Sequence, residues 1–69
     1  GLYNISRRTS SPRPGDLVFF TGTYDTPGVS HVGIYVGDGW MLHCGDPIGY
    51  ANLNTSYWQS HFYAYGRLP

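Results

Sequence analysis

The clearest alternation of hydrophobic and polar residues lies in the middle of the chain, where two short apolar runs flank the Gly-Asp-Gly sequence of residues 37–39. The runs cover residues 31–36 and 40–44 and are rich in β-branched and aromatic side chains. An Asp-Gly pair between such runs is a strong signal for a β-hairpin. The pattern therefore predicts two antiparallel strands, with His31 and His43 towards their outer ends.

Two turn geometries would give this hairpin different registers. A two-residue turn at residues 38–39 would pair Ile34 with His43 and put the two histidines on opposite faces of the sheet. A three-residue turn through residues 37–39, with Gly39 at positive φ, pairs Gly33 with His43. We predict the three-residue turn, because it places both imidazoles on one face and separates polar from apolar side chains.

The predicted register also pairs Val36 with Trp40 and assigns a role to each face of the hairpin. One face is uniformly apolar and is expected to be buried; it carries Val32, Ile34, Val36, Trp40, Leu42 and Cys44. The other face carries His31, Gly33, Tyr35, Met41 and His43. A glycine beside the histidines would let another backbone segment or a helix end approach closely.

Two histidines on one face suit a site of proton transfer, because imidazole titrates near neutral pH. The plainer alternative is a pair of strand histidines hydrogen-bonded to the backbone, since structural histidines outnumber catalytic ones. Cys44 follows His43 directly, and adjacent strand residues point to opposite faces. We therefore expect Cys44 to be a small, buried hydrophobic residue that faces away from the histidines.

The segments before the hairpin consist of a connector, a turn and a strand. Residues 1–13 are rich in Ser, Thr, Pro and Arg, and they are interpreted as a flexible N-terminal segment. A Pro-Gly-Asp turn follows, in which Asp16 is expected to cap the turn rather than face a cleft. The Val- and Phe-rich run Leu17–Thr21 predicts a strand. Residues 22–29 form a loop that could border a groove next to the histidines.

The segments after the hairpin predict a loop, one short helix and a last strand. Residues 45–54 are interpreted as a loop, and Asn54 or Thr55 as the N-cap of a helix. Trp58 and Phe62 are spaced i, i+4 and should pack on the sheet. The alternation in residues 62–68 predicts a strand, in which Gly66 permits close packing or a bulge. His61 is expected to lie at the surface.

Composition limits the classes of function. A chain of 69 residues forms at most one domain, and its 41% hydrophobic and 12% charged content suits a β-rich core rather than a disordered chain. The formal net charge of zero gives no argument for a nucleic-acid or membrane-lipid partner. The seven tyrosines are expected to fill the core, because no basic groove accompanies them.

A metal site is not predicted. The residues that could ligate a metal are His31, His43, Cys44, Asp46 and His61. Zinc sites usually show paired ligands at short, regular spacing, whereas adjacent strand residues such as His43 and Cys44 cannot easily converge on one ion. No metal and no other cofactor is therefore expected.

Three stretches carry a resemblance to a known family: P-G-D-L-V-F-F, S-H-V-G-I-Y-V-G-D-G and M-L-H-C-G. From residue 14 to residue 68 the chain resembles the NlpC/P60 cell-wall peptidases, which are papain-like cysteine peptidases that cut peptidoglycan stem peptides. Residues 48–68 look most like the endopeptidase domain of bifunctional wall hydrolases of Gram-positive bacteria. The resemblance implies an α+β fold, with a small antiparallel sheet or partial barrel and one short helix. Residues 14–69 would then be the C-terminal part of an NlpC/P60 domain.

The resemblance also implies roles for individual residues. His31 matches the general base, and His43 matches the polar residue that orients that base. Ser30 and Tyr35, which are near the histidines in sequence, are expected to contact substrate. The family nucleophile is a cysteine in an upstream Asp-Cys-Ser motif, which residues 1–13 do not contain. The implied substrate is a peptidoglycan stem peptide cut next to D-glutamate, at the cell wall or outside the cell, by a monomeric protein.

Because the nucleophile is not among these residues, whether this chain is itself an enzyme stays open. The alternative is a module that binds wall peptides without cleaving them, or a degenerate remnant of a peptidase. An Asp-Cys-Ser motif upstream in a longer protein would favour the peptidase, and its absence would favour the alternative.

Overall fold

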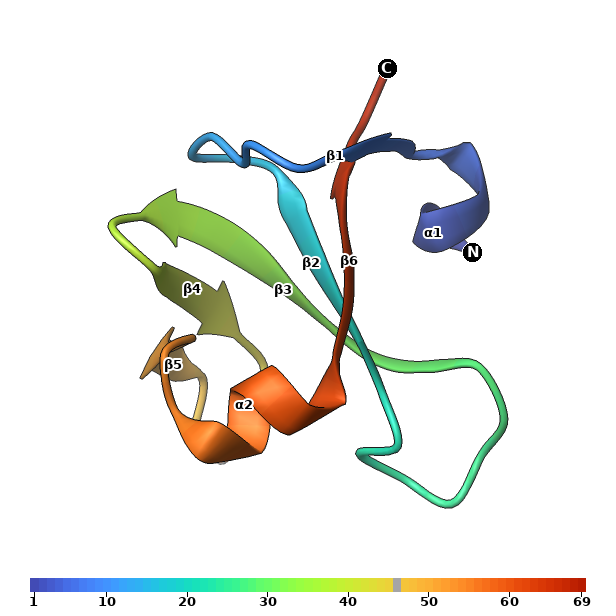
Figure 1. Cartoon of the computed structure of the whole chain (residues 1–69), viewed down its shortest axis with the longest axis vertical. Helices are drawn as coiled ribbons and strands as arrows, with labels where there is room; N and C mark the ends of the chain where they lie inside the picture. Colours follow the sequence, from blue (N-terminus) through green and yellow to red (C-terminus); the bar gives the residue numbers. More distant parts are fainter. Residues whose placement is uncertain (46) are drawn as a thin grey trace.

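Antiparallel hydrogen bonding builds one open sheet of six strands in the order β1-β6-β2-β3-β4-β5, with two short helices (Figure 1). The computed structural model describes residues 1–45 and 47–69. The α+β class with a small antiparallel sheet is confirmed; the sheet is open, and the described residues form two helices rather than the one predicted. The elements are α1 Leu2–Ile5, β1 Arg7–Thr9, β2 Leu17–Thr21, β3 Val29–Gly37, β4 Trp40–His43, β5 Gly49–Asn52, α2 Ser56–His61 and β6 Phe62–Arg67.

Strand β2 lies at the centre of the sheet and has the bounds that its sequence predicts. Its first four residues are 0 to 6% exposed, because both faces of the strand are covered. Val18 and Phe20 belong to a core cluster with Met41 and Leu53, against which Trp58 of α2 packs. On the opposite face, the ring of Phe19 meets the ring of Tyr3 edge-on at 5.2 Å.

The β3–β4 hairpin has the predicted pairing of Gly33 with His43, but its turn differs. Gly37 pairs with Trp40, and the register shifts between Tyr35 and Gly37, so Val36 forms a bulge. The predicted pairing of Val36 with Trp40 is therefore wrong. The turn itself has two residues, Asp38 and Gly39, both at positive φ as in a type I′ turn, and Gly39 was predicted to be so. The bulge allows a turn that follows the twist of the strands without changing the register near the histidines.

Burial of the two hairpin faces is the reverse of the prediction. Met41, on the histidine face, is fully buried, whereas Ile34, Val36 and Trp40 on the apolar face are 44%, 38% and 43% exposed. The reason is that α2 and its Trp58 cover the histidine face, where they close the core. In the part of the chain that the structure describes, the apolar face is left largely open.

Gly33 serves the core rather than an approaching segment. A Cβ atom at this position would lie 2.5 Å from Sδ of Met41. The space beside the histidines, which was predicted to admit another backbone segment, is therefore filled by the Met41 side chain.

Three elements were not predicted. Residues 1–13 contain α1 and β1, and residues 45–54 contain β5. Strand β1 consists of Arg7, Arg8 and Thr9 and has no apolar alternation, so its strand conformation depends on pairing with β6. Strand β5 likewise pairs with β4 along its whole length. Such short strands take their conformation from the neighbouring strand rather than from their own sequence.

Helix α2 begins as predicted, with Thr55 as the N-cap whose hydroxyl accepts from the Trp58 N–H at 3.4 Å. Two further expectations were wrong. Phe62 starts β6 instead of packing on the sheet, and it is 39% exposed with its ring against Tyr65. His61 is half-buried, and its Nδ1 lies 2.8 Å from the carbonyl oxygen of Thr21.

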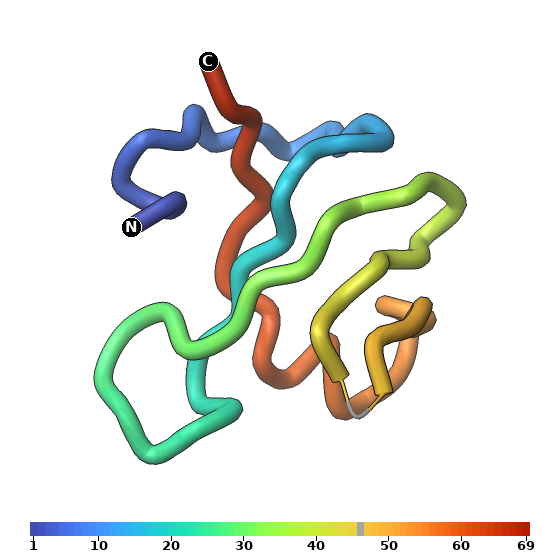
Figure 2. The backbone as a smooth tube through the Cα atoms, turned by 180° about the vertical axis from the view of Figure 1, so that it is seen from behind, coloured from blue at the N-terminus to red at the C-terminus, as the bar shows by residue number. Residues whose placement is uncertain are grey.

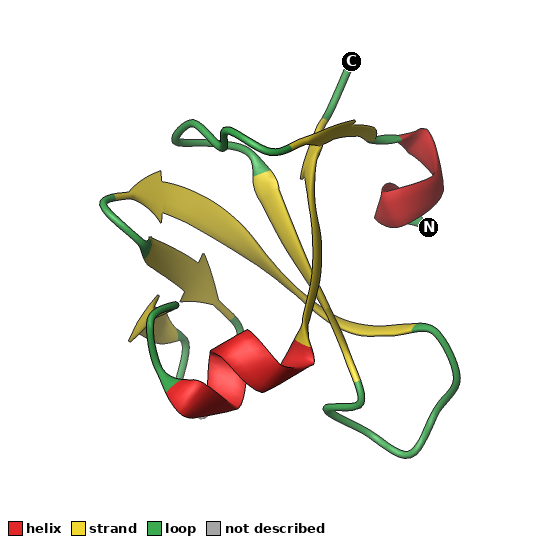
Figure 3. Ribbon diagram, in the orientation of Figure 1, coloured by secondary structure: helices red, strands yellow, loops and turns green. Residues whose placement is uncertain are grey.

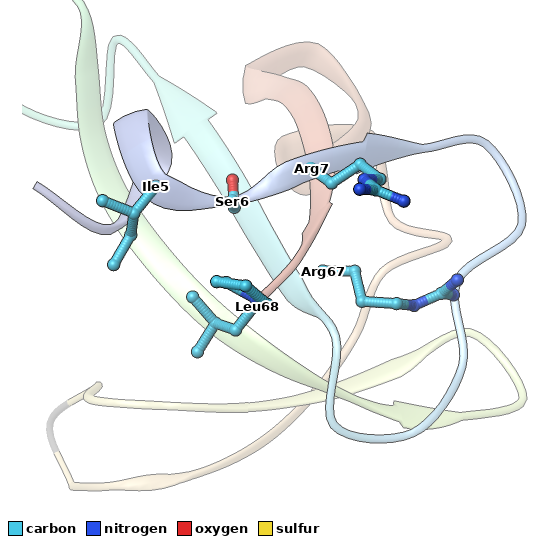
Figure 4. A pocket seen from close by; sticks show the side chains of 6 residues that line it. Ile5, Ser6, Arg7, Arg67 and Leu68 are labelled. Carbon is cyan, nitrogen blue, oxygen red and sulfur yellow. The ribbon is translucent and has the colours of Figure 1, made fainter.

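Strand β6 is confirmed, and Gly66 packs closely as predicted, since a Cβ there would lie 2.5 Å from Ser6 Oγ. A pocket between the two ends of the chain is lined by Ile5, Ser6, Arg7, Arg67, Leu68 and Pro69 (Figure 4). It contains neither His31 nor His43.

Asp16 connects the start of β2 to the end of β6. Its carboxylate is buried and accepts from the Arg13 N–H at 2.8 Å, which confirms the predicted turn-capping role. The same carboxylate accepts from Nε and Nη2 of Arg67 at 3.0 and 2.7 Å, a bidentate ion pair that the sequence did not predict. The hydrogen bond from Arg67 is the main reason why the pKa of Asp16 is lowered.

We expect Asp16→Asn to lower the free energy of unfolding by about 1 to 2 kcal/mol, as measured by urea denaturation at neutral pH. The loss is moderate because the Arg67 side chain is 35% exposed and remains partly hydrated. Asp25→Asn, in an exposed loop, is the matched control and should change stability by less than about 0.5 kcal/mol. The pKa of Asp16 in the folded chain is lowered from 3.8. The contribution of Asp16 to the free energy of unfolding should therefore be fully present above pH 3.8 and be lost as the pH falls through the lowered pKa. Equal stability of the two variants would contradict this assignment.

Candidate active site

The two histidines of the hairpin are in direct contact. Nε2 of His31 lies 3.0 Å from Nδ1 of His43, with the ring planes nearly perpendicular at 87°. The register produces this contact, because Gly33 lies opposite His43 and His31 is the preceding residue on the same face. The prediction that both imidazoles share one face is confirmed.

Aromatic side chains surround this histidine pair. The indole of Trp58 stacks on His31 at 5.7 Å with an interplanar angle of 20°, and it meets His43 edge-on at 5.1 Å. Phe20 approaches the His31 ring at 6.1 Å. Burial, and then the nearby charge of a protonated His43, lower the pKa of His31. His31 is therefore a neutral imidazole at neutral pH, which is the form that a general base needs.

The contact also determines which nitrogen can exchange a proton. Since Nε2 of His31 faces His43, Nδ1 is the nitrogen that remains for a reacting group. For Nδ1 to accept a proton, Nε2 must carry the hydrogen and donate it to Nδ1 of His43. His43 then carries its own hydrogen on Nε2. In this tautomer His43 acts as an acceptor that orients His31.

A small pocket opens over the pair. Its lining residues are Thr23, Tyr24, His31, His43, Cys44, Gly45, Tyr57 and Trp58. Thr23 and Tyr24 belong to the loop between β2 and β3, which was expected to border a groove and which projects from the sheet in Figure 2. Tyr24 and Tyr57 are 66% and 51% exposed and flank the histidines. The described lining contains no Asp, Glu, Lys or Arg side chain.

Neither Ser30 nor Tyr35 is among the residues that line this pocket. The Ser30 hydroxyl accepts from the Thr23 N–H at 3.0 Å and is 2.6 Å from the Thr23 hydroxyl, so it holds the base of the loop. The Tyr35 hydroxyl accepts from the Gly39 N–H at 3.0 Å, at the turn end of the hairpin.

The position of Cys44 differs from the prediction. Strand β4 ends at His43, and the Gly45 N–H donates to the His43 carbonyl at 3.1 Å, so the chain turns at Cys44. The prediction of a buried Cys44 is wrong, because Cys44 is exposed. It is among the residues that line the histidine pocket and also among those that line the groove on the apolar face. The alternation of a strand no longer applies to a residue beyond its end.

Potential metal ligands do not gather in the described part of the chain. No group of three or more His, Cys, Asp or Glu side chains comes together among residues 1–45 and 47–69. Asp46, which was one of the residues considered, lies outside the described residues. Neither described helix is long and apolar enough to cross a membrane.

The positions of Trp58, Tyr24 and Tyr57 at the site were not predicted. The sequence assigned Trp58 only to packing on the sheet, and its spacing contains no signal that connects it to the histidines. That connection depends on α2 crossing the face that carries His31 and His43, which is a tertiary arrangement.

Comparison with known proteins agrees with this geometry. The model of the NlpC/P60 family matches residues 2–67. The chain belongs to the NlpC/P60 family. Over 55 residues it is 49% identical to the bifunctional muramidase/DL-endopeptidase CwlT of Bacillus subtilis, covering 78% of this chain and 17% of that protein. Over 63 residues it is 41% identical to the probable peptidoglycan endopeptidase LytE of the same organism, covering 90% of this chain and 18% of LytE.

A solved structure shows the same fold. The NLP/P60 family protein from Staphylococcus aureus, described as similar to a lipoprotein, superposes with a TM-score of 0.91 at 39% identity. The match covers 96% of this chain and 23% of that one. The chain therefore spans less than a quarter of the structure and less than a fifth of the two Bacillus proteins.

We expect His31 to titrate below the ordinary value of 6.5, because its burial disfavours the imidazolium. Between the lowered pKa and 6.5 the unfolded chain binds more protons than the folded chain, so the free energy of unfolding should fall as the pH is lowered through this window. The His31 Cε1–H resonance, followed by NMR against pH, measures the pKa directly. His31→Gln is the control and should lack this part of the pH dependence of stability. A midpoint at or above 6.5 would contradict the expectation.

Proposed function

We propose that this chain is the histidine-bearing C-terminal part of a cysteine endopeptidase domain that cleaves peptidoglycan stem peptides next to D-glutamate. The observation that carries the proposal is the 3.0 Å contact between His31 and His43, in a member of the NlpC/P60 family. Relatives named as a peptidoglycan endopeptidase, a DL-endopeptidase and a gamma-DL-glutamyl hydrolase support the substrate class.

The two histidines would divide the work of proton transfer. Nδ1 of His31 takes the proton of a cysteine thiol supplied by an upstream segment, and the thiolate attacks the peptide carbonyl. The imidazolium then returns the proton to the leaving amine. His43 accepts from Nε2–H of His31 throughout, so it maintains the useful tautomer and stabilises the cation while it forms.

The open apolar face of the sheet supports an upstream partner segment. A groove of about 260 Å³ lies on this face and is almost entirely apolar. It is lined by Leu2, Leu17, Val32, Gly33, Ile34, Leu42, His43, Cys44 and Ile48. A large exposed apolar surface usually marks an interface. Because His43 and Cys44 are among the lining residues, a segment packed along the groove would lie close to the histidine pair and could place its cysteine beside His31.

The proposed function also implies a partner, a location and an oligomeric state. The partner is a peptidoglycan stem peptide, the location is the cell wall or the outside of a bacterium, and the active species is a monomer without a cofactor. Ser30 contributes through the loop that borders the pocket, because its hydroxyl holds Thr23. Tyr35 contributes through the hairpin turn, where its hydroxyl accepts from Gly39.

A non-catalytic function has one observation in its favour. The single cysteine, Cys44, follows His43 directly instead of occupying an Asp-Cys-Ser motif. Without a thiol placed on Nδ1 of His31, the aromatic-flanked pocket would bind a stem peptide and leave it intact. The two functions differ in a single measurement, which is turnover once the upstream segment is present.

We expect the 69-residue chain to release no product from a γ-D-glutamyl-diaminopimelate peptide, measured by mass spectrometry, because no residue supplies the upstream nucleophile. A longer protein that includes an upstream Asp-Cys-Ser segment should cleave the same peptide. The matched control is Cys44→Ala, which should leave the longer protein active. Turnover by the short chain that disappears in Cys44→Ala would make Cys44 the nucleophile and contradict the proposal.

In the active, longer protein the two histidines should respond differently to substitution. His31→Ala removes the base and should lower kcat/KM by about 10²- to 10⁴-fold. His43→Gln should be milder, because the amide oxygen can still accept from the imidazole N–H. Arg7→Gln, an exposed residue at the other end of the sheet, is the control. Equal, near-complete losses in His31→Ala and His43→Gln would argue against an orienting role, and full activity in His31→Ala would rule out the peptidase.

A further inference from the structure

Helix α2 places one side chain over both histidines. Figure 3 shows the two helices far apart, with α2 beside the strands that carry His31 and His43. The indole of Trp58 stacks on the His31 ring at 5.7 Å and meets the His43 ring at 5.1 Å. On the core side it contacts the fully buried Phe20, at 4.8 Å between ring centroids. Trp58 therefore joins the hydrophobic core to the histidine pair.

The stacked indole restricts the orientation of the His31 ring. Rotation of an imidazole about its last torsion is only weakly restricted by the side chain itself, so packing must define the plane of the ring. A single hydrogen bond at 3.0 Å to His43 leaves the His31 ring free to tilt about that bond. The nearly parallel indole, at 20°, removes this freedom and also covers the hydrogen bond on one side. A hydrogen bond kept from water is stronger and exchanges its proton more slowly.

Two electrostatic effects of the indole on His31 oppose each other. An aromatic face attracts a cation, which favours the imidazolium. The same face displaces water, which disfavours it. The pKa of His31 is lowered with burial as the first cause, and the stacked indole is one of the groups that bury the ring.

We propose that Trp58 is a positioning residue, which holds the His31 ring in the plane that its hydrogen bond to His43 requires and shields that bond from water. This role rests on the proposed function, because a fixed base matters only if it transfers a proton. Trp58 acts through His31 and not on the reacting bond. The interaction pairs a core residue of α2 with a reactive residue of β3, so the stability of the core and the orientation of the base depend on the same side chain.

The described groups that could also affect the titration of His31 lie in the two pockets that it lines. They are His43 and Cys44 at the end of β4, Tyr24 in the loop between β2 and β3, Tyr57 on α2, and Tyr3 with the terminal amino group of Gly1 beside α1. None of these groups is altered by a substitution at Trp58, so the variants below change the indole and leave the other titratable groups in place.

The test uses NMR on the 69-residue chain and needs no turnover, so it is independent of whether the peptidase proposal holds. Three variants are compared with the wild type: Trp58→Leu, Trp58→Phe and Leu53→Ala. Trp58→Leu keeps a hydrophobic but smaller side chain and removes the flat aromatic face, and Trp58→Phe keeps a smaller aromatic face. Leu53→Ala weakens the same core cluster and alters no residue of the histidine pocket. Circular dichroism establishes that each variant is folded.

We expect the wild-type chain to show a slowly exchanging imidazole N–H resonance of His31. Trp58→Leu should lose this resonance and move the His31 titration to higher pH, because water reaches the ring. Trp58→Phe should retain part of both properties, and Leu53→Ala should keep both while its melting temperature falls.

Four outcomes would overturn the proposal: no protected resonance in the wild type, wild-type behaviour in Trp58→Leu, the same changes in Leu53→Ala, or a titration in Trp58→Leu that moves to lower pH. If Trp58→Leu fails to fold, Trp58→Phe decides the question. A His31 resonance and a His31 titration in Trp58→Phe that are identical to those of the wild type would also overturn the proposal.

Discussion

The pairing of Gly33 with His43 is the constraint on which the rest of the site depends. A shift of one residue would move His43 to the opposite face of the sheet, where it could not reach His31. The chain has this register although its turn is not the three-residue turn that was predicted together with it. The bulge at Val36 absorbs the extra residue, so a two-residue turn with both residues at positive φ closes the hairpin. The hydrogen bond between the two imidazoles is thus a consequence of backbone pairing at His43, two residues along β3 from His31.

The two faces of the sheet differ in burial. Helix α2 covers the histidine face, and there Trp58 packs against a core that includes Met41 and Phe20, next to the histidine pair. The opposite face carries Ile34 and its apolar neighbours, largely exposed. The proposed upstream segment would cover this face, and His43 and Cys44 are among the residues that it would contact there.

A second set of interactions holds the ends of the chain in place. The Asp16–Arg67 pair connects the turn before β2 to the end of β6, and Gly66 lets Ser6 and Phe19 pack against the last strand. These contacts join segments that are far apart in sequence. They organise the end of the sheet that lies away from the histidines, while α2 and the β3–β4 hairpin organise the site.

Local sequence determined the elements whose signals are local. The Val- and Phe-rich run of β2, the existence of the hairpin and the Thr55 cap of α2 were predictable, because propensity, turn chemistry and capping act over a few residues. The pairing of Gly33 with His43 was predictable as well, since of the two registers considered only this one separates apolar from polar side chains and puts both histidines on one face. The three-residue turn predicted with it was wrong. Short strands such as β1 and β5 were not predictable, because their conformation comes from pairing with a neighbour.

Tertiary structure alone decided which face of the hairpin is buried, and the prediction failed there. Alternation of Ile34 and Leu42 with His43 and Met41 shows that two faces exist, but not which one receives α2. The end of β4 at His43 likewise decided that Cys44 is exposed. The position of Trp58 over both imidazoles has the same origin, because contacts between a helix and a sheet depend on how the two elements cross and not on the spacing of residues within either one.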